Sequence, residues 1–470
     1  MNSEDTICAL STSPGQGAIA VIRISGASAI SVADDIFYQK GRKGILKNKE
    51  AGTIHYGRIK FNNEELDDVI LSLFRAPRSY TGEDTIEISC HGSIYIQQRI
   101  LEILIENGAR LAKPGEYTLR AFLNGKLDLS QAEGVADLIA SGSAAAHRLA
   151  MNQIRGGFSE EIKKLRDELL NFISLIELEL DFSEEDVEFA NRDQLNDLIN
   201  KVGNLLKGLI SSFEYGNVIK NGIPVAIIGP ANSGKSTLLN RLLKEERAIV
   251  SEFAGTTRDF IEDTIILDGI QFRFIDTAGL RKTNDFIEIE GIQRSMKKYS
   301  QASVVIVLID PTEKIEEIQE SLSYIGEGDI NDINKNIILI LNKVDLLTSK
   351  EVKIKMNLYS DSWKGVKNQL AISAKDGTGI SDLEAVLIAE ARKRYKSEQN
   401  VVVTNARHFE ALKHADDALE RAKEGISYNV PTDLLAQDIR EVLHYLGEIT
   451  GEITTDEILG NIFKNFCIGK

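Results

Sequence analysis

The chain has 470 residues, 43% of them hydrophobic, and 71 acidic against 55 basic residues, which gives a formal net charge of −16. Length alone suggests about three domains with sizeable cores. A protein that binds nucleic acid through its overall field is normally basic, so this charge excludes that class. Any RNA contact must use a local basic patch or a partner's surface, and the net charge fits a partner's surface.

Cysteine usage and the N-terminal segment predict a soluble, cytoplasmic protein. The three cysteines include no CxxC pair, which is typical of a reducing compartment and gives no sign of a disulfide framework or a zinc cluster. The segment Met1–Asp5 is acidic and lacks the basic start of a signal peptide. No apolar run approaches the roughly 18 residues that a membrane span needs.

Residues 1–120 have the pattern of a mixed α/β domain. Apolar and alternating runs predict strands at Ile7–Leu10, Ala18–Ile24, Val69–Phe74 and Thr85–Cys90, and a helix follows over Ile94–Glu106. Cys90 and His91 are neighbours on a strand and point to opposite faces, which argues against a nucleophile–base pair.

Three charged residues of the N-terminal region are candidates for a site. Arg23 lies inside an apolar run, where a charge is costly unless it is paired. Glu83 and Lys126 lie in the segments YTGED and AFLNGKLDL. For each of the three, the alternative is an ordinary surface or salt-bridged residue.

Two helical blocks flank a central segment. Between about residues 130 and 213, apolar residues such as Ile162, Leu165 and Leu169 recur at spacings of three and four, and the helical pattern resumes from Ala406 to the end. We expect the two blocks to pack together as one discontinuous domain, with residues 216–396 inserted between them.

The inserted segment opens with a P-loop. The apolar run Ile223–Ile228 leads into GPANSGKST at residues 229–237, and a helix is expected over Ser236–Leu243. Strand, GxxxxGK[ST] and helix in this order are typical of a loop whose backbone N–H groups surround phosphates. Lys235 would reach the β- and γ-phosphates, and the Ser236 hydroxyl would bind Mg²⁺.

The next motifs belong to the switch region of a GTPase. AGTTRD at 254–259 is a candidate switch loop in which Thr257 completes the Mg²⁺ shell. The runs Ile261–Leu267 and Ile270–Ile275 flank Asp-Gly and predict a hairpin, which leads to DTAG at 276–279. There Asp276 would hold Mg²⁺ through water, and the Gly279 N–H would meet the γ-phosphate.

Base recognition is predicted after two further buried strands, Val304–Ile309 and Ile337–Leu341. They lead to NKVD at 342–345, where Asp345 would accept both N1–H and N2–H₂ of guanine, a pair that adenine lacks. SAK at 373–375 would close the base pocket. The predicted GTP-binding residues are Asn232, Ser233, Gly234, Lys235, Ser236, Thr237, Ser251, Glu252, Phe253, Ala254, Gly255, Thr256, Thr257, Asp276, Thr277, Ala278, Gly279, Asn342, Lys343, Val344, Asp345, Ser373, Ala374 and Lys375.

The position that often carries a water-orienting glutamine, just after DxxG, is Leu280, which cannot orient water. Glu288 is the candidate for that task. Positive charge at the β–γ bridge would come from Arg258, from Arg281 or from a monovalent cation, held by the Asn232 side chain and by backbone carbonyls of residues 251–256.

The chain ends in CIGK, and Gly469 and Lys470 do not fit a prenylation signal. Two interpretations of Cys467 remain. It is either a buried cysteine at a helix end or an accessible thiol beside the Lys470 cation, which would favour the thiolate.

These features together resemble the tRNA modification GTPase family known as MnmE or TrmE. The resemblance rests on GTPase motifs between two helical blocks, on AGTTRD in the switch and on the terminal CIGK. The N-terminal segments TICA, VIRISG, YTGED, KPGEY and NGKLDL are similar to the family too, so the resemblance covers essentially the whole chain.

The resemblance implies a GTP-hydrolysing component of a tRNA modification complex. With an FAD-dependent partner, MnmG (GidA), the family adds a carboxymethylaminomethyl or aminomethyl group at C5 of wobble uridine 34, using a tetrahydrofolate one-carbon unit. It also implies a homodimer formed through the N-terminal domain, a heterotetramer or larger complex with the partner, and hydrolysis activated by potassium-dependent dimerisation of the GTPase domains.

The resemblance also assigns roles to residues of this chain. The implied sites are Arg23, Glu83, Lys126 and Lys470 for folate; Asn232, Ser251, Phe253 and Thr256 for potassium; Ser236 and Thr257 for Mg²⁺; Glu288 for orienting water; and Cys467 for the modification chemistry. One departure is that the family commonly has Pro directly before the Asn. Here Pro230 stands one residue earlier and Ala231 takes its place, so we expect a small backbone shift that retains Asn232.

We therefore expect a multidomain α/β plus all-α protein. Residues 1–120 would form an N-terminal α/β tetrahydrofolate-binding and dimerisation domain, residues 121–215 and 397–470 a discontinuous helical domain, and residues 216–396 an inserted Ras-like P-loop GTPase domain. The alternative function is a regulatory GTPase switch in ribosome assembly, where hydrolysis only times binding. Folate binding by the N-terminal domain distinguishes the two.

Overall fold

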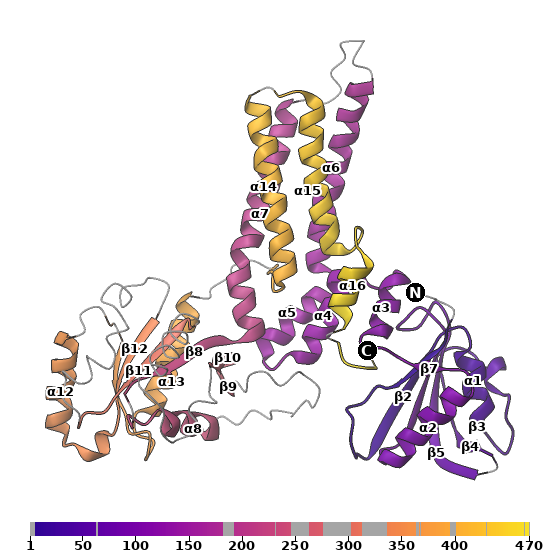
Figure 1. Ribbon diagram of the computed structural model, residues 1–470, viewed down its shortest axis with the longest axis horizontal. Coiled ribbons are helices and arrows are strands. Elements are labelled where there is room, and N and C mark those ends of the chain that lie inside the picture. The colour runs from indigo at the N-terminus through magenta and orange to yellow at the C-terminus, as the bar shows by residue number, and fades with distance from the viewer. Residues whose placement is uncertain are drawn as a thin grey trace. The chain divides into compact units, whose positions relative to one another are not determined.

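The chain divides into two compact units, each with its own β-sheet (Figure 1). Unit 1 comprises Met1–Ile139, Met151–Gly203 and His414–Lys470, and unit 2 comprises Ala140–Ala150 and Asn204–Lys413. The computed structural model describes residues 5–62, 64–181, 192–230, 232–245, 263–275, 302–312, 336–362, 366, 368–394, 401–428, 430–464 and 466–469. The three-domain division expected from the sequence stays a prediction.

Unit 1 contains a seven-stranded sheet in the order β3-β4-β5-β6-β2-β1-β7. Its pairs are antiparallel except for β1 with β7, which is parallel. The strands are β1 (Ile7–Leu10), β2 (Ile19–Ser25), β3 (Phe37–Tyr38), β4 (Thr53–Phe61), β5 (Glu64–Phe74), β6 (Thr85–His91) and β7 (Arg110–Leu111). The four predicted strands are therefore confirmed, and β3, β4 and β7 were missed.

Helices α1 (Ala29–Ile36) and α2 (Ile94–Glu106) pack on this sheet through one apolar core. The alternation of β6 places Cys90 in that core and leaves His91 exposed, as predicted for neighbours on a strand. Because burial raises the pKa of Cys90 to about 11, the thiol is protonated and no nucleophile–base pair forms.

The rest of unit 1 is helical. Its helices include α3 (Glu116–Leu123), α4 (Leu129–Ala140), α6 (Gly157–Asp181), α15 (Thr432–Thr450) and α16 (Asp456–Phe463). The buried Arg166 of α6 donates a 2.7 Å hydrogen bond to the Leu443 carbonyl of α15, and Arg440 pairs with Glu177 at 2.6 Å. The helical segments on either side of the P-loop segment are thus in contact, as predicted.

Unit 2 contains a six-stranded sheet in the order β13-β12-β11-β8-β10-β9, in which only the edge strand β9 is antiparallel. The strands are β8 (Ile223–Ile228), β9 (Asp263–Leu267), β10 (Ile270–Phe274), β11 (Val304–Ile309), β12 (Asn336–Leu341) and β13 (Asn368–Ala371). Asp268 and Gly269 both have positive φ, at 50° and 76°, which forms the predicted hairpin turn between β9 and β10.

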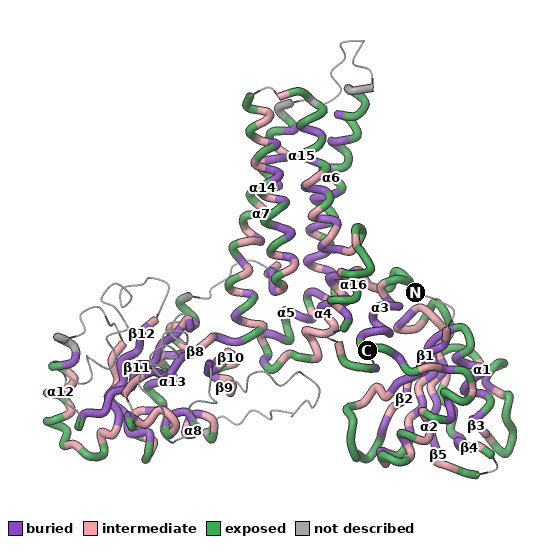
Figure 2. Tube along the Cα trace, in the orientation of Figure 1, coloured by how far each residue is buried: buried purple, intermediate pink, exposed green. Residues whose placement is uncertain are grey.

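Helices cover both faces of this sheet, which is the layering of an α/β domain. Helices α8 (Lys235–Glu245) and α13 (Ile380–Arg394) pack on one face, and α12 (Ser349–Ser362) packs on the other. The buried strands between them stand out in Figure 2. The carboxyl ends of the parallel strands carry the GTPase motifs, as this fold class predicts for ligand sites.

Three further helices are α5 (Ala144–Ile154), α7 (Arg192–Asn221) and α14 (Ala406–Ser427). In unit 2, the Val403 N–H donates a 3.0 Å hydrogen bond to the Ser212 hydroxyl, and the rings of Phe213 and Phe409 stack at 4.3 Å. Across the part of the chain that the structure describes, no helix is both long and apolar enough to cross a bilayer.

Candidate functional site: a nucleotide loop and an N-terminal polar cluster

Two glycines of the P-loop lie where a side chain would collide with neighbouring atoms. A Cβ on Gly229 would lie 2.2 Å from the Leu308 carbonyl oxygen, and one on Gly234 would lie 2.2 Å from Asn342 Nδ2. Both glycines also have positive φ, at 152° and 99°. The spacing of glycines in the motif is therefore a packing requirement, which lets the loop between β8 and α8 curl tightly.

Backbone carbonyls at the start of the P-loop hold the ammonium group of Lys235. Lys235 Nζ donates hydrogen bonds to the carbonyls of Gly229 at 2.9 Å and Pro230 at 2.6 Å. Ser236 and Thr237 follow in the first turn of α8, where the helix N-terminus favours negative charge. An ammonium, a hydroxyl and the N–H groups of a helix N-terminus at one place are a donor set suited to phosphates and Mg²⁺.

Asn232 is exposed and adopts left-handed backbone geometry, with φ at 59°. Asparagine tolerates this conformation better than most residues do. Its amide oxygen is therefore accessible at the loop, and an amide oxygen is a suitable ligand for a hard cation.

Asn342 connects three motifs through one buried amide. Its Nδ2 donates to the Ser233 carbonyl at 2.8 Å, and its Oδ1 accepts from the Ala374 N–H at 3.0 Å. The side chain is 2% exposed, so both hydrogen bonds are shielded from water. The P-loop, NKVD and SAK segments are thereby fixed relative to one another.

The predicted base-reading carboxylate is oriented by a neighbour. The Ser373 hydroxyl donates to Asp345 Oδ1 at 2.7 Å. Arg241 of α8 donates to the Lys375 and Ala374 carbonyls and so holds the SAK segment from the other side. A carboxylate in a fixed orientation can accept two parallel N–H bonds, as guanine recognition requires.

A contact that the motifs did not predict joins Lys343 to Asp310 at the end of β11, with Nζ 2.5 Å from Oδ2. Burial acts to raise the pKa of Asp310, but hydrogen bonds from Lys343 and Thr312 outweigh it and lower that pKa. Lys343 has a positive φ of 56°. This ion pair explains how NKVD keeps a strained backbone conformation.

Part of the predicted site lies outside the described residues. Those residues are Ser251, Glu252, Phe253, Ala254, Gly255, Thr256, Thr257, Asp276, Thr277, Ala278, Gly279, Glu288 and Lys470. Their predicted roles stay predictions.

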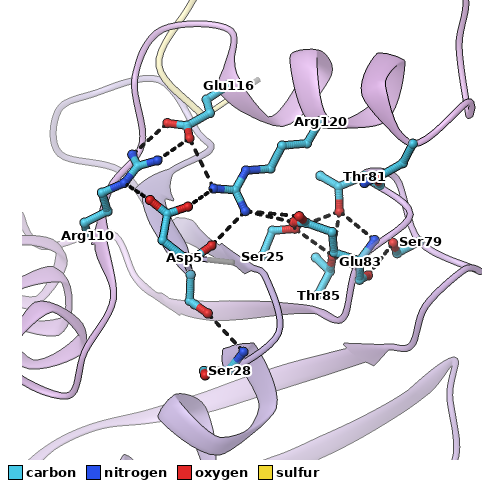
Figure 3. A network of polar contacts seen from close by, with 12 residues as sticks. Asp5, Ser25, Ser28, Ser79, Thr81, Glu83, Thr85, Arg110, Glu116 and Arg120 are labelled. Carbon is cyan, nitrogen blue, oxygen red and sulfur yellow. Dashed lines mark hydrogen bonds and ion pairs between the residues drawn. The ribbon is translucent and has the colours of Figure 1, made fainter. Parts of the chain in front are cut away.

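In unit 1, Glu83 belongs to a polar network that the sequence did not reveal (Figure 3). It accepts hydrogen bonds from Arg120 Nη1, at 3.1 Å to each oxygen, and from the Ser25 hydroxyl at 2.8 Å. Arg120 also pairs with Asp5 at 2.7 Å and Glu116 at 3.2 Å. Arg120 is 6% exposed, so Glu83 is fixed by a buried cation.

Arg23 is paired, as a charge in an apolar run requires. It forms an ion pair with Glu87 at 2.7 Å, and its guanidinium lies 5.4 Å and 5.5 Å from the ring centroids of Tyr80 and Tyr117. Burial raises the pKa of Tyr80. A guanidinium bordered by two tyrosine rings is suited to a flat, anionic ligand.

Lys126 lies beside the loop that carries Glu83. Its Nζ donates to the Pro77 carbonyl at 3.1 Å, and a Cβ on Gly82 would approach its Cγ to 3.4 Å. The structure therefore brings Glu83 and Lys126 together at one loop, with Arg23 on the neighbouring strand β2.

The C-terminal tail packs against the same region of unit 1. The Gly469 carbonyl accepts 3.4 Å hydrogen bonds from Ser11 Oγ and Arg23 Nη1, and the Cys467 carbonyl accepts one from the Gly115 N–H. The Cys467 side chain is exposed, so the interpretation as a buried helix-end cysteine is wrong. The tail presents an accessible thiol at Cys467, and its Gly469 carbonyl contacts Arg23.

Comparison with known proteins identifies relatives along the whole chain. The sequence matches the family descriptions "GTP-binding protein TrmE N-terminus" over residues 6–126 and "MnmE helical domain" over residues 129–467. A protein of Flavobacterium psychrophilum named "tRNA modification GTPase MnmE" is 54% identical over 468 residues, which cover 99% of each chain. Proteins of the same name from Flavobacterium johnsoniae and Parabacteroides distasonis are 52% and 51% identical, and the matches cover at least 99% of each chain.

Proposed function

Because the chain belongs to the MnmE family of tRNA modification GTPases, we propose that it hydrolyses GTP as a component of a system that modifies tRNA. The observation that carries this proposal is the Asn342 amide, which joins the P-loop, NKVD and SAK segments in one buried arrangement. This arrangement supports a single site for phosphate binding and base recognition.

Within this site, Lys235 and the N-terminus of α8 bind the phosphates, and Asp345, oriented by Ser373, reads guanine. Ser236 with Thr257 would hold Mg²⁺, which neutralises charge that develops on the phosphates. Asn232, with carbonyls of Ser251, Phe253 and Thr256, would hold K⁺. Glu288 orients the attacking water in this proposal.

The finer proposal concerns the chemistry on tRNA. The chain acts with the FAD-dependent MnmG partner to place a carboxymethylaminomethyl or aminomethyl group at C5 of wobble uridine 34. Arg23, Glu83, Lys126 and Lys470 bind the tetrahydrofolate one-carbon donor. The anchored guanidinium of Arg23 between two tyrosine rings supports this assignment, as does the exposed thiol of Cys467 on the adjacent tail.

Assembly and location complete the proposal. The N-terminal domain forms a homodimer, and potassium-dependent contact between GTPase domains activates hydrolysis. The reaction takes place in the cytoplasm, which the free, reduced state of all three cysteines supports.

The deciding experiment replaces the thiol. We expect tRNA from cells that carry only the Cys467→Ser form to lack the C5 substituent at the wobble uridine in nucleoside mass spectrometry, while the purified variant hydrolyses GTP at the wild-type rate. A Cys90→Ala form serves as the matched control and retains the modification, because Cys90 is buried in the core. Normal tRNA from the Cys467→Ser cells would assign the thiol a structural role and favour a regulatory switch in ribosome assembly.

A further inference from the structure

A segment between β3 and β4 runs against the acidic composition of the chain. Residues 40–49, which we call the basic loop, contain five basic residues and no acidic one. The basic residues are Lys40, Arg42, Lys43, Lys47 and Lys49. The local charge of +5 contrasts with the formal net charge of −16 for the whole chain.

The charges of the basic loop are accessible and uncompensated. Lys40, Arg42, Lys43 and Lys47 are exposed, and no carboxylate among the described residues forms an ion pair with any of the five. The adjacent strand β4 differs in this respect, because Arg58 and Lys60 are neutralised by Glu65 and Asp68. The loop therefore keeps a positive charge that the adjacent strand does not.

The first half of the basic loop is a tight turn. Gln39 and Arg42 exchange backbone hydrogen bonds of 2.9 Å and 3.0 Å, while Lys40 and Gly41 both have positive φ, at 50° and 77°. Two successive residues with positive φ are the geometry of a type I′ turn. This turn orders the backbone that carries Lys40, Arg42 and Lys43.

The second half is fixed from both sides. Asp34, which is 2% exposed, accepts hydrogen bonds from the N–H groups of Leu46 at 2.9 Å and Lys47 at 3.4 Å. Arg75 Nη2 donates to the carbonyls of Lys47 at 2.8 Å and Lys49 at 3.2 Å. Because the backbone is already ordered, a ligand that binds the loop does not bear the entropic cost of ordering it.

We propose that the basic loop is a docking surface for the phosphate backbone of tRNA, an inference that rests on the proposed function for its ligand. Exposed lysine and arginine side chains bind phosphates without reading sequence. An acidic protein surface would meet the same charges, but RNA is the polyanion that the proposed reaction requires. The net negative charge of the remaining chain disfavours non-specific RNA contact elsewhere.

The test compares two variants of the full-length protein with equal net charge. One carries Lys40→Gln, Arg42→Gln, Lys43→Gln and Lys47→Gln, and the control carries four glutamines at exposed lysines elsewhere. The control positions are Lys163, Lys244, Lys350 and Lys353. The affinity for fluorescently labelled tRNA is measured by anisotropy over a salt series, and thermal unfolding and GTP hydrolysis verify that both variants are folded.

We expect the wild type and the control to bind tRNA with the same steep dependence of affinity on salt. The basic-loop variant should bind roughly tenfold or more weakly at low salt, and its slope of log affinity against log salt should be shallower by about 0.7–0.9 for each phosphate that the variant no longer neutralises. Equal affinity and slope for the two variants would overturn the inference, as would a wild type without salt-dependent tRNA affinity. A basic-loop variant that binds tRNA normally but no longer binds an acidic protein partner would also overturn it.

These outcomes are separate from the fate of the proposed function. The basic-loop variant keeps the thiol and the nucleotide site, so its tRNA affinity tests docking alone. Loss of wobble modification in Cys467→Ser cells tests the function and does not depend on the loop. Failure of one result therefore leaves the other standing.

Discussion

At the scale of single residues, the nucleotide site depends on how closely the P-loop approaches Asn342. We expect Gly234→Ala to abolish measurable GTP binding, because its Cβ would lie 2.2 Å from Asn342 Nδ2 and would separate the amide from the Ser233 carbonyl. Isothermal titration with a non-hydrolysable GTP analogue measures this loss.

The matched control for this variant is Gly269→Ala in the β9–β10 turn. That glycine also has positive φ, but no atom lies within 4 Å of the site of an added Cβ. The Gly269→Ala substitution should lower the free energy of unfolding only by the backbone strain of about 1 kcal/mol. It should leave nucleotide affinity unchanged. If both variants bind GTP equally, the close approach of Gly234 to Asn342 is not needed for nucleotide binding.

Spacing in the sequence predicted the members of the nucleotide site, because each motif follows a strand whose apolar run is visible. It did not predict their partners. Arg120, which holds Glu83, and Asp310, which pairs with Lys343, lie 37 and 33 residues away along the chain. Such pairings are set by tertiary packing, which no local pattern encodes.

At the scale of elements, local periodicity located β1 and α2 at their observed bounds but missed β4. Gly57 interrupts the apolar pattern of that strand, and the structure gives the reason, since a Cβ there would lie 2.4 Å from the Phe37 ring. The docking of the C-terminal tail was also beyond local patterns, because Ser11 and Gly469 are 458 residues apart.

The tail yields the prediction that belongs to this scale. Gly469→Ala should displace the tail, because the added Cβ would lie 2.3 Å from the Leu10 carbonyl oxygen at a φ of 97°. A fluorophore on Cys467 reports the change as a fall in steady-state anisotropy. We also expect wobble modification to fall while GTP hydrolysis is unchanged.

Gly460→Ala in α16 is the control for the tail. An added Cβ there meets no atom within 4 Å, and alanine favours a helix over glycine by roughly 1 kcal/mol. The fluorophore should therefore stay as immobile as in the parent protein. Equal anisotropy in both variants would mean that the tail is not anchored through Gly469.

At the scale of the whole molecule, the two units have separate cores, so acid should not destabilise them equally. The cluster in unit 1 ties Asp5, near the N-terminus, to α3. Hydrogen bonds from Arg110 lower the pKa of Asp5. Burial acts to raise the pKa of Glu116, but Arg110 and the Lys113 N–H outweigh it and lower that pKa.

A carboxyl group whose pKa is lowered on folding stabilises the protein above its unfolded pKa, which is about 4, and loses that contribution as the pH falls. We therefore expect unit 1 to lose stability between roughly pH 5 and pH 3. Pulse-labelling hydrogen exchange at increasing urea concentrations measures each unit separately, with peptides from β6 for unit 1 and from β11 for unit 2.

The Arg120→Met variant distinguishes the contribution of this cluster from the general effect of acid on the protein. It removes a buried cation and leaves the half-buried Glu83 without its partner, so unit 1 should lose about 3 kcal/mol at pH 7, and its stability should fall less steeply with acid. Arg58→Met is the control, since Arg58 pairs with Glu65 and Asp68 on the surface, where ion pairs contribute little to stability. If Arg120→Met destabilises unit 1 no more than Arg58→Met does, the buried network does not hold the N-terminal segment on α3.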